Sequence, residues 1–195
     1  MKSPIFIFSL PRAGSTLLQR ILMSHNDIAS IAEPWLILPQ IYALKKQGSI
    51  SEYSSYTANQ GISDFIMNLP EKEVDYRNSL RDFILELYAK QCKNNELFFL
   101  DKTPRYYLII DEIVELFPDA KFIFLFRNPL HVYASIVNTW GNKRFNKLFS
   151  TYDDIIFGTP KLSKAYIKHQ DKSLSLKYED LILNSDIELK KLFNY

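Results

Sequence analysis

Short runs rich in apolar residues recur along the chain, and each is followed by a stretch in which apolar residues return every three or four positions. The runs have the length of buried strands and fall at residues 5–8, 28–32, 97–100, 121–126 and 174–178. The run at 121–126 has no polar alternation, which is typical of a strand buried on both faces of a parallel sheet. Strands that alternate with helices predict a three-layer α/β fold, with a central parallel sheet flanked by helices.

Helical spacing predicts helices at residues 15–24, 35–44, 78–93, 107–117 and 129–137. One more helix is expected within 153–170 and another near 187–193. Pro34 is expected in the first turn of the second of these helices, where a proline is tolerated. The pattern weakens at residues 47–77, where only short helices near 64–69 are expected. We interpret 47–77 as a variable insertion on the substrate side of a single domain that covers 1–195. A basic, aromatic loop is predicted at 141–152.

The composition is that of an ordinary globular protein. Of 195 residues, 47% are hydrophobic, and 24 basic against 22 acidic side chains give a net charge of +2. So balanced a charge gives no reason to expect a nucleic-acid partner. Apolar segments stay well short of the roughly 20 residues of a membrane span, and no secretory leader is evident, so we expect a cytoplasmic protein.

Cysteine and histidine offer little chemistry. The single cysteine, Cys92, lies in a helical pattern, which favours an inert and partly buried thiol. The three histidines lack the spacing of metal ligands, so no metal site is expected. His25 is tempting as a base, but it ends the first predicted helix and is interpreted as structural first.

The first predicted strand leads into an unusual turn. The strand breaks at Pro11, and Arg12, the turn residue Gly14 and the hydroxyls of Ser15 and Thr16 follow before the helix continues. The first N–H groups of a helix lack internal acceptors, and the helix dipole favours negative charge there. An arginine adds a fork of donors that matches phosphate or sulfate. The turn therefore predicts a site for a phosphate ester or a close relative.

Comparison of this turn with the nucleotide P-loop, G-x-x-x-x-G-K-[ST], weakens a kinase hypothesis. Aligning Gly14 and Thr16 with the last glycine and the hydroxyl places Ser9 at the first glycine and Ser15 at the lysine. The lysine that reaches the β- and γ-phosphates is therefore missing from its place. A plain aspartate to support Mg²⁺ is also missing at the strand ends, apart from Asp101 with its following lysine.

Charged residues follow four of the predicted strands. Arg12 follows the first strand, Glu33 the second, Lys102 the third and Arg127 the fourth. The carboxyl ends of parallel strands meet at one edge of a sheet, where ligands bind. The topology therefore predicts that these side chains gather at one site. Taken singly, Arg127 favours a capping or salt-bridge role, and Glu33 and Lys102 are as compatible with solvated surface positions as with a site.

Four phrases of the sequence resemble a known family. Pro11-Arg12-Ala13-Gly14-Ser15-Thr16-Leu17-Leu18 resembles the 5′-phosphosulfate loop of sulfotransferases that use 3′-phosphoadenosine 5′-phosphosulfate (PAPS). Arg127-Asn128-Pro129, with Ser135 eight residues beyond Arg127, resembles their 3′-phosphate motif. Asp101-Lys102-Thr103-Pro104-Arg105 and Tyr178-Glu179-Asp180-Leu181 are also typical of them. The pattern is closer to the tyrosylprotein and bacterial branches than to the cytosolic phenol and steroid enzymes.

The resemblance implies a P-loop-like fold and transfer of a sulfuryl group from PAPS to a hydroxyl or amine. Its cofactor-binding residues would be Arg12, Ala13, Gly14, Ser15, Thr16, Leu17, Arg127 and Ser135. It assigns the general base to Glu33, with Lys102 and Arg12 stabilising charge around the sulfonate and the leaving group, and no metal. A carboxylate beside these cations tends to stay ionised, which limits its basicity, and desolvation by Trp35 would offset this. The acceptor would be a small-molecule, glycan or peptide hydroxyl.

Two alternatives remain open at this stage. The first is a small-molecule kinase on the related nucleotide fold. The second is a non-catalytic nucleotide-binding fragment. The resemblance implies a basic segment after the last helix that closes over the 3′-phosphate and adenine, and the chain ends at Tyr195, so a C-terminally incomplete domain is expected.

Overall fold

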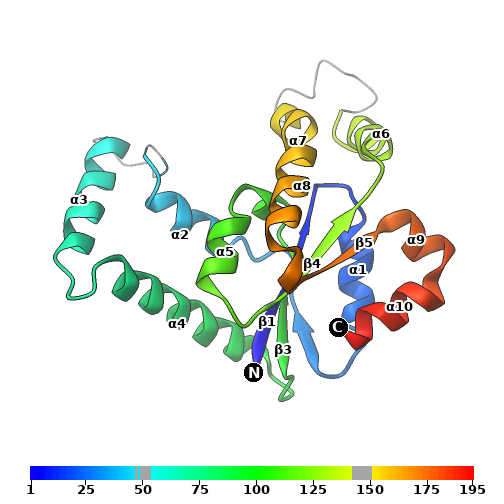
Figure 1. Cartoon of the computed structure of the whole chain (residues 1–195), viewed down its shortest axis with the longest axis horizontal. Coiled ribbons are helices and arrows are strands. Elements are labelled where there is room, and N and C mark those ends of the chain that lie inside the picture. The colour runs from blue at the N-terminus through cyan, green and yellow to red at the C-terminus, as the bar shows by residue number, and fades with distance from the viewer. Residues whose placement is uncertain (47, 49–53, 142–150) are drawn as a thin grey trace.

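A central sheet of five parallel strands organises the molecule (Figure 1). The computed structural model describes residues 1–46, 48, 54–141 and 151–195. The strands are β1 (Ser3–Ser9), β2 (Ile28–Ser30), β3 (Phe98–Asp101), β4 (Lys121–Phe126) and β5 (Ser173–Lys177), in the order β2-β3-β1-β4-β5. This confirms the predicted α/β class and the place of every predicted strand. Because all pairs are parallel, the five carboxyl ends lie at one edge.

The middle of the sheet is apolar on both faces, as the absence of polar alternation predicts. In the register of the sheet, Phe6 of β1 pairs with Asp101 of β3 and with Phe122 of β4. Phe6, Ile7 and Phe8 are fully buried. Successive side chains of a strand point to opposite faces, so Phe6 and Phe8 serve one face and Ile7 the other.

The larger face carries an aromatic core. The rings of Phe6, Phe8 and Phe122 stack with centroids 5.9–6.3 Å apart. Several helices cover this face: α2 (Ile37–Ala43), α4 (Glu73–Gln91), α5 (Ile110–Leu116), α6 (Pro129–Thr139) and α8 (Gly158–His169). The opposite face packs against α1 (Ser15–Leu22), α9 (Tyr178–Leu183) and α10 (Ser185–Asn194), as Figure 1 shows. These layers leave the carboxyl edge of the sheet for the ends of the strands and the loops that follow them.

Residues 47–77 are more helical than predicted. Helix α3 (Ser55–Met67) runs for 13 residues, and α4 already begins at Glu73. The spacing of apolar residues did not predict the full length of α3, because this helix buries only Ile66, while Phe65 and Met67 are exposed. A side-chain cap begins the helix, since Ser54 accepts a hydrogen bond from the Thr57 N–H.

Three further boundaries differ from the prediction. Helix α2 begins at Ile37 rather than at Pro34, because Trp35 has a φ of 56° and interrupts the helical backbone. The predicted helix at 107–117 is divided into a 3₁₀ turn (η1, Pro104–Leu108) and α5. In the region of 153–170, the short helix α7 (Tyr152–Ile156) precedes α8. The predicted loop at 141–152 lies mostly outside the described residues.

Candidate active site

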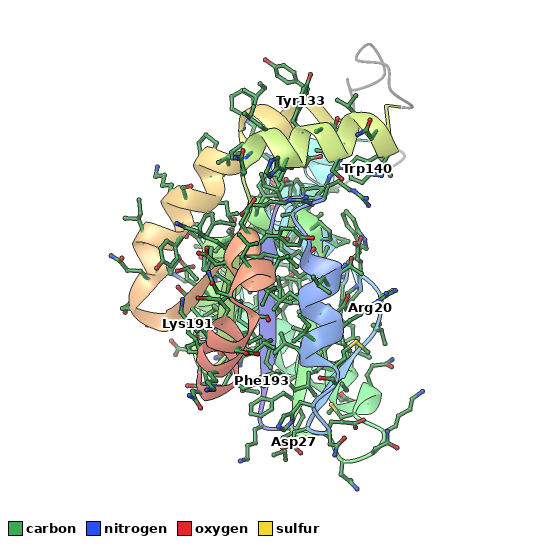
Figure 2. All side chains as sticks on the ribbon, turned by 90° about the vertical axis from the view of Figure 1, so that its right-hand side faces the viewer. Arg20, Asp27, Tyr133, Trp140, Lys191 and Phe193 are labelled. Atoms are coloured by element: carbon green, nitrogen blue, oxygen red, sulfur yellow. The ribbon has the colours of Figure 1, made fainter. Side chains whose placement is uncertain are left out.

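A cavity of about 410 Å³ opens at the carboxyl edge of the sheet. Its lining comes from segments far apart in the sequence: Pro11, Arg12, Gly14, Ser15, Thr16, Glu33, Trp35, Pro104, Arg105, Arg127, Ser135 and Trp140. Figure 2 shows Trp140, just beyond α6, toward the top of the molecule and Asp27 toward the bottom, at the other end of the sheet. The topology thus gathers Arg12, Glu33 and Arg127 as predicted, while Lys102 lies directly behind Glu33.

The turn between β1 and α1 is shaped to hold an anion. Arg12 and Gly14 both have left-handed backbones, with φ values of 65° and 94°. Helix α1 has no side-chain cap, and the N–H groups of Gly14, Ser15 and Thr16 find no acceptor in the part of the chain that the structure describes. These N–H groups lie at the positive end of the helix dipole. A negatively charged ligand would satisfy them.

Gly14 is required by the packing as well as by its backbone. A Cβ atom built at this position would lie 2.2 Å from the ring of Tyr178. Tyr178 begins α9, directly after β5, so its ring supports the turn from the end of an edge strand that β4 separates from β1. Tyr178 was not predicted as a site residue, although it lies in one of the four phrases that resemble the family.

Arg127 joins the turn to the end of β4. Its Nη1 donates to the main-chain oxygen of Arg12 at 2.9 Å, and its guanidinium lies 4.3 Å from the centroid of the Tyr178 ring. The Arg12 side chain crosses the other way, with Nε donating to Ser135 Oγ at 3.3 Å. The two predicted halves of the site are therefore in direct contact.

The two arginines keep their positive charge available. Among the described residues neither Arg12 nor Arg127 forms an ion pair with a carboxylate, and Arg127 Nε is buried without a hydrogen-bond partner. A buried donor without a partner costs free energy, about 1–3 kcal/mol. An anion that reached this nitrogen would remove the penalty. By contrast, Arg105 is held by Asp154 at 2.9 Å.

A second pair of charges lies on the other side of the cavity. Lys102 is 3% exposed, and its Nζ donates to Glu33 Oε1 at 2.9 Å, while the Glu33 side chain is 37% exposed. A buried ammonium group requires a counter-charge, and Glu33 supplies one. The pair therefore fixes the Glu33 carboxylate at the cavity wall.

Beneath this pair lies a buried carboxylate. Asp101, at the end of β3, accepts hydrogen bonds from the hydroxyls of Tyr88, Tyr106 and Thr103. Burial raises the pKa of Asp101 to about 6, although these hydrogen bonds and the Lys102 charge act in the opposite direction. The carboxylate is fully enclosed, so its charge is balanced by these neighbours alone.

The same hydroxyls hold the segment that follows Glu33. Thr103 Oγ1 accepts from the Trp35 N–H at 3.3 Å, and Tyr106 Oη accepts from the Ile37 N–H at 3.2 Å. Trp35 has a left-handed backbone, which costs a residue with a side chain about 1–2 kcal/mol. The hydrogen bond from Thr103 helps to hold this conformation.

Some predicted site residues do not reach the cavity. Ala13 is buried in the core, and Leu17, with 37% of its surface exposed, does not line the cavity either. His25, which was interpreted as structural and not as a site residue, stacks on Phe193 of α10. Residues of 47–77 that the structure describes are also missing from the lining, so their role on the substrate side stays a prediction.

Trp140 and Arg105 line the cavity although neither was predicted as a site residue, and Trp35 was expected only to affect Glu33. Trp35 lies two residues beyond Glu33, and Arg105 lies three residues beyond Lys102, so their nearness to these assigned residues in the sequence was the available signal. Trp140 had none, because only the fold brings the end of α6 to the cavity.

The described residues offer neither a metal centre nor a membrane-spanning helix. No group of three or more His, Cys, Asp or Glu side chains there is arranged to hold a metal ion. None of the helices in those same ranges combines the length and apolar character that crossing a membrane requires.

The sequence comparisons agree on one family. The profile described as the sulfotransferase family matches residues 4–195. The nodulation protein NoeE of Sinorhizobium fredii is 32% identical over 139 residues, which are 70% of this chain and 31% of NoeE. Protein-tyrosine sulfotransferase 1 of Danio rerio is 24% identical over 195 residues, 98% of this chain and 52% of that protein. The chain thus spans about a third of the length of NoeE and about half of the length of the tyrosine sulfotransferase.

Solved structures show the same fold. The sulfotransferase domain from the curacin biosynthetic pathway has a TM-score of 0.60 and 22% identity, over 100% of this chain and 73% of that one. Mouse sulfotransferase SULT7A1, solved in complex with PAP, has a TM-score of 0.53 and 14% identity, over 98% of this chain and 57% of that one. The parallel sheet, the turn at its carboxyl edge and the profile match over nearly the whole sequence lead to one conclusion: the chain belongs to the sulfotransferase family.

Proposed function

We propose that the protein transfers a sulfuryl group from PAPS to a hydroxyl or amine of an acceptor. The observation that carries this proposal is the contact between the two cationic halves of the site. Arg127 donates to the main chain of Arg12, and Arg12 donates to Ser135, so the anion-binding turn and the end of β4 form one surface. A ligand with phosphate groups at both ends of one nucleoside suits such a surface. The complex of SULT7A1 with PAP is consistent with this choice of ligand.

The cofactor would bind with its 5′ end at the turn. The N–H groups of Gly14, Ser15 and Thr16 and the hydroxyls of Ser15 and Thr16 would hold the 5′-phosphate. Arg127 and Ser135 would hold the 3′-phosphate, which offers Arg127 Nε the partner that it lacks. Arg12 lies between the two groups through its contacts with both Arg127 and Ser135.

The transfer step requires a base, and Glu33 is the carboxylate among the described residues that lines the cavity. Glu33 would take the proton of the acceptor hydroxyl while the acceptor oxygen forms its bond to sulfur. The bond between sulfur and the 5′-phosphate oxygen breaks in line, and adenosine 3′,5′-bisphosphate leaves with the electron pair. Arg12, Lys102 and the N–H groups of the turn would stabilise the negative charge on the sulfonate and on this leaving oxygen.

Lys102 can serve Glu33 as well as the sulfonate. Because the ammonium group is buried and paired, it orients the carboxylate at the cavity wall. The acceptor would be a small-molecule, glycan or peptide hydroxyl. A nodulation protein and protein-tyrosine sulfotransferases are both among the relatives, which is compatible with more than one of these classes.

The test is transfer of labelled sulfate from PAPS to a panel of sugars, phenols and tyrosine peptides, with parallel reactions that contain ATP and Mg²⁺. The proposal expects labelled acceptor and release of adenosine 3′,5′-bisphosphate. Phosphorylation from ATP, with no transfer from PAPS, would instead favour a small-molecule kinase. Ser15 at the position of the P-loop lysine argues against that outcome.

A further inference from the structure

Asp101 stands outside the chemistry proposed above, yet it lies at the centre of a buried polar network. Its carboxylate is fully buried. Three hydroxyls from three places donate to it: Tyr88 from α4, Tyr106 from η1, and Thr103 two residues further along the chain. A buried carboxylate is expensive unless it is fully hydrogen-bonded, so this arrangement requires a reason.

An ionised carboxylate decides the direction of every hydrogen bond in this network. It can only accept, so the hydroxyl hydrogens of Tyr106 and Thr103 must both point toward it. Each of these two oxygens then presents only lone pairs to its other neighbour. Those neighbours are the N–H groups of Ile37 and Trp35, which need acceptors. The carboxylate thus commits both hydroxyls to hold the main chain.

The main-chain groups held in this way belong to the segment that carries Glu33. Trp35 lies two residues beyond Glu33, and its left-handed backbone turns the chain into α2. Ile37 begins α2, whose preceding residue supplies no side-chain cap, so Tyr106 satisfies the first N–H of that helix. Lys102, the partner of Glu33, directly follows Asp101. One carboxylate therefore connects both members of the Glu33–Lys102 pair.

We propose that Asp101 is a positioning residue for sulfuryl transfer, and that its ionised carboxylate holds Glu33 in place through Thr103–Trp35 and Tyr106–Ile37. This inference rests on the proposed function. Asp101 is buried and does not line the cavity, so it acts on the base and not on the substrate.

The charge state of Asp101 should then be visible in the reaction. The groups that face it are Tyr88, Tyr106, Thr103 and the Lys102 ammonium, which is shared with Glu33. With a pKa of about 6, the carboxyl group gains a proton in mildly acidic solution. A protonated carboxyl must donate from one oxygen, to Thr103 or to one of the two tyrosines, Tyr88 and Tyr106. When it donates to Thr103 or to Tyr106, that hydroxyl turns its hydrogen away and stops accepting from Trp35 or Ile37. Activity should fall on the acidic side for this reason.

The first test uses Asp101→Asn, whose amide donates from one of the two positions at every pH. We expect kcat to fall by about 10- to 100-fold, as for a base displaced by a fraction of an ångström to 1 Å. Affinity for adenosine 3′,5′-bisphosphate should not change. The acidic limb of kcat near pH 6 should disappear from the pH profile of the variant. Tyr195→Phe is the matched control, because its hydroxyl also accepts a main-chain N–H, from Phe122, far from the cavity.

A second test does not depend on activity. Hydrogen exchange of the Trp35 and Ile37 amides, followed by NMR without cofactor, should be about tenfold faster in Asp101→Asn at one or both positions, which corresponds to one lost hydrogen bond. Thr103→Val should accelerate Trp35 alone, and Thr103→Ser should restore its protection. These milder variants keep the test valid if Asp101→Asn does not fold.

The possible failures can be told apart. Unchanged exchange at both amides in Asp101→Asn and in Thr103→Val would overturn the proposed positioning role. Transfer by the wild-type chain with an unaltered kcat in Asp101→Asn would overturn it as well, and would leave the proposed function standing. No transfer from PAPS by the wild-type chain would contradict the proposed function, and the exchange rates would still decide whether Asp101 holds the Glu33 segment.

Discussion

The two sides of the cavity treat charge in opposite ways. On the side of β1 and β4, Arg12 and Arg127 have no carboxylate partner among the described residues, and the N–H groups of the turn have no acceptor there. On the side of β2 and β3, Lys102 is paired with Glu33, and Asp101 is surrounded by three hydroxyls. The first side is incomplete, with donors that find no acceptor among the described residues, whereas the second side is complete, with its charges satisfied inside the protein.

This difference explains how residues at one edge of the sheet can both bind a cofactor and carry out proton transfer. On the first side, water solvates the donors that are exposed to the cavity until a ligand arrives, and the buried Arg127 Nε gains a partner only when an anion binds. Buried charges must be satisfied within the protein, and their fixed partners hold them in one geometry. We therefore assign cofactor binding to the incomplete side and proton transfer to the complete side. Substitutions on the two sides should accordingly affect different quantities.

The largest effect is expected for Glu33→Gln. An amide cannot take the acceptor proton, so kcat should fall by about 10²- to 10⁴-fold. The amide oxygen can still accept from Lys102, so the fold and the affinity for adenosine 3′,5′-bisphosphate should be largely kept. Steady-state kinetics and calorimetry would measure the two quantities.

The control for this variant is Glu86→Gln, which breaks an exposed Glu–Lys pair on α4 with a 2.6 Å contact to Lys90. It should leave kcat unchanged. Full activity in Glu33→Gln would assign the base to another residue.

Gly14→Ala tests the support of the turn. The added methyl group would meet the Tyr178 ring at 2.2 Å, and the backbone φ of 94° is unfavourable for alanine. Strain and overpacking together should cost about 2–5 kcal/mol of the free energy of unfolding. Urea denaturation would measure this loss.

Gly61→Ala is the matched control, because a Cβ at Gly61 of α3 meets nothing within 4 Å. It should be neutral or slightly stabilising, since alanine suits a helix better than glycine. Equal stabilities of the two variants would contradict the packing of Tyr178 against the turn.

Asp101 gives a pH dependence of stability with the opposite sign to its effect on activity. Its pKa rises from 3.8 to about 6 on folding, so the folded chain binds the proton more tightly. The stability contributed by this group is full below the unfolded pKa and is lost as the pH rises through about 6. From pH 4 to pH 7 the wild type should lose about 2 kcal/mol of its free energy of unfolding relative to Asp101→Asn. Denaturation at several pH values would measure this difference. The same pH dependence of the free energy of unfolding in wild type and Asp101→Asn would contradict a raised pKa.

The strands and the gathering of charges at their ends could be predicted because they follow from local pattern and parallel topology. The run at 121–126 became β4 with the same bounds. The extent of α3 could not be predicted, since its exposed Phe65 gives no amphipathic period. The contacts of Tyr178 and Asp101 were also out of reach, because they depend on how side chains from separate elements meet in space.

The most direct measurement is calorimetry of adenosine 3′,5′-bisphosphate against adenosine 5′-monophosphate, with the wild type, Arg127→Ala and Arg20→Ala. Arg20 is an exposed arginine in the last turn of α1 and serves as the control (Figure 2). We expect the wild type and Arg20→Ala to prefer the bisphosphate. Arg127→Ala should lose about 10- to 100-fold of that preference, as for a lost charge-assisted hydrogen bond. Equal affinities of the wild type for adenosine 3′,5′-bisphosphate and adenosine 5′-monophosphate would contradict a site that holds both ends of the nucleotide.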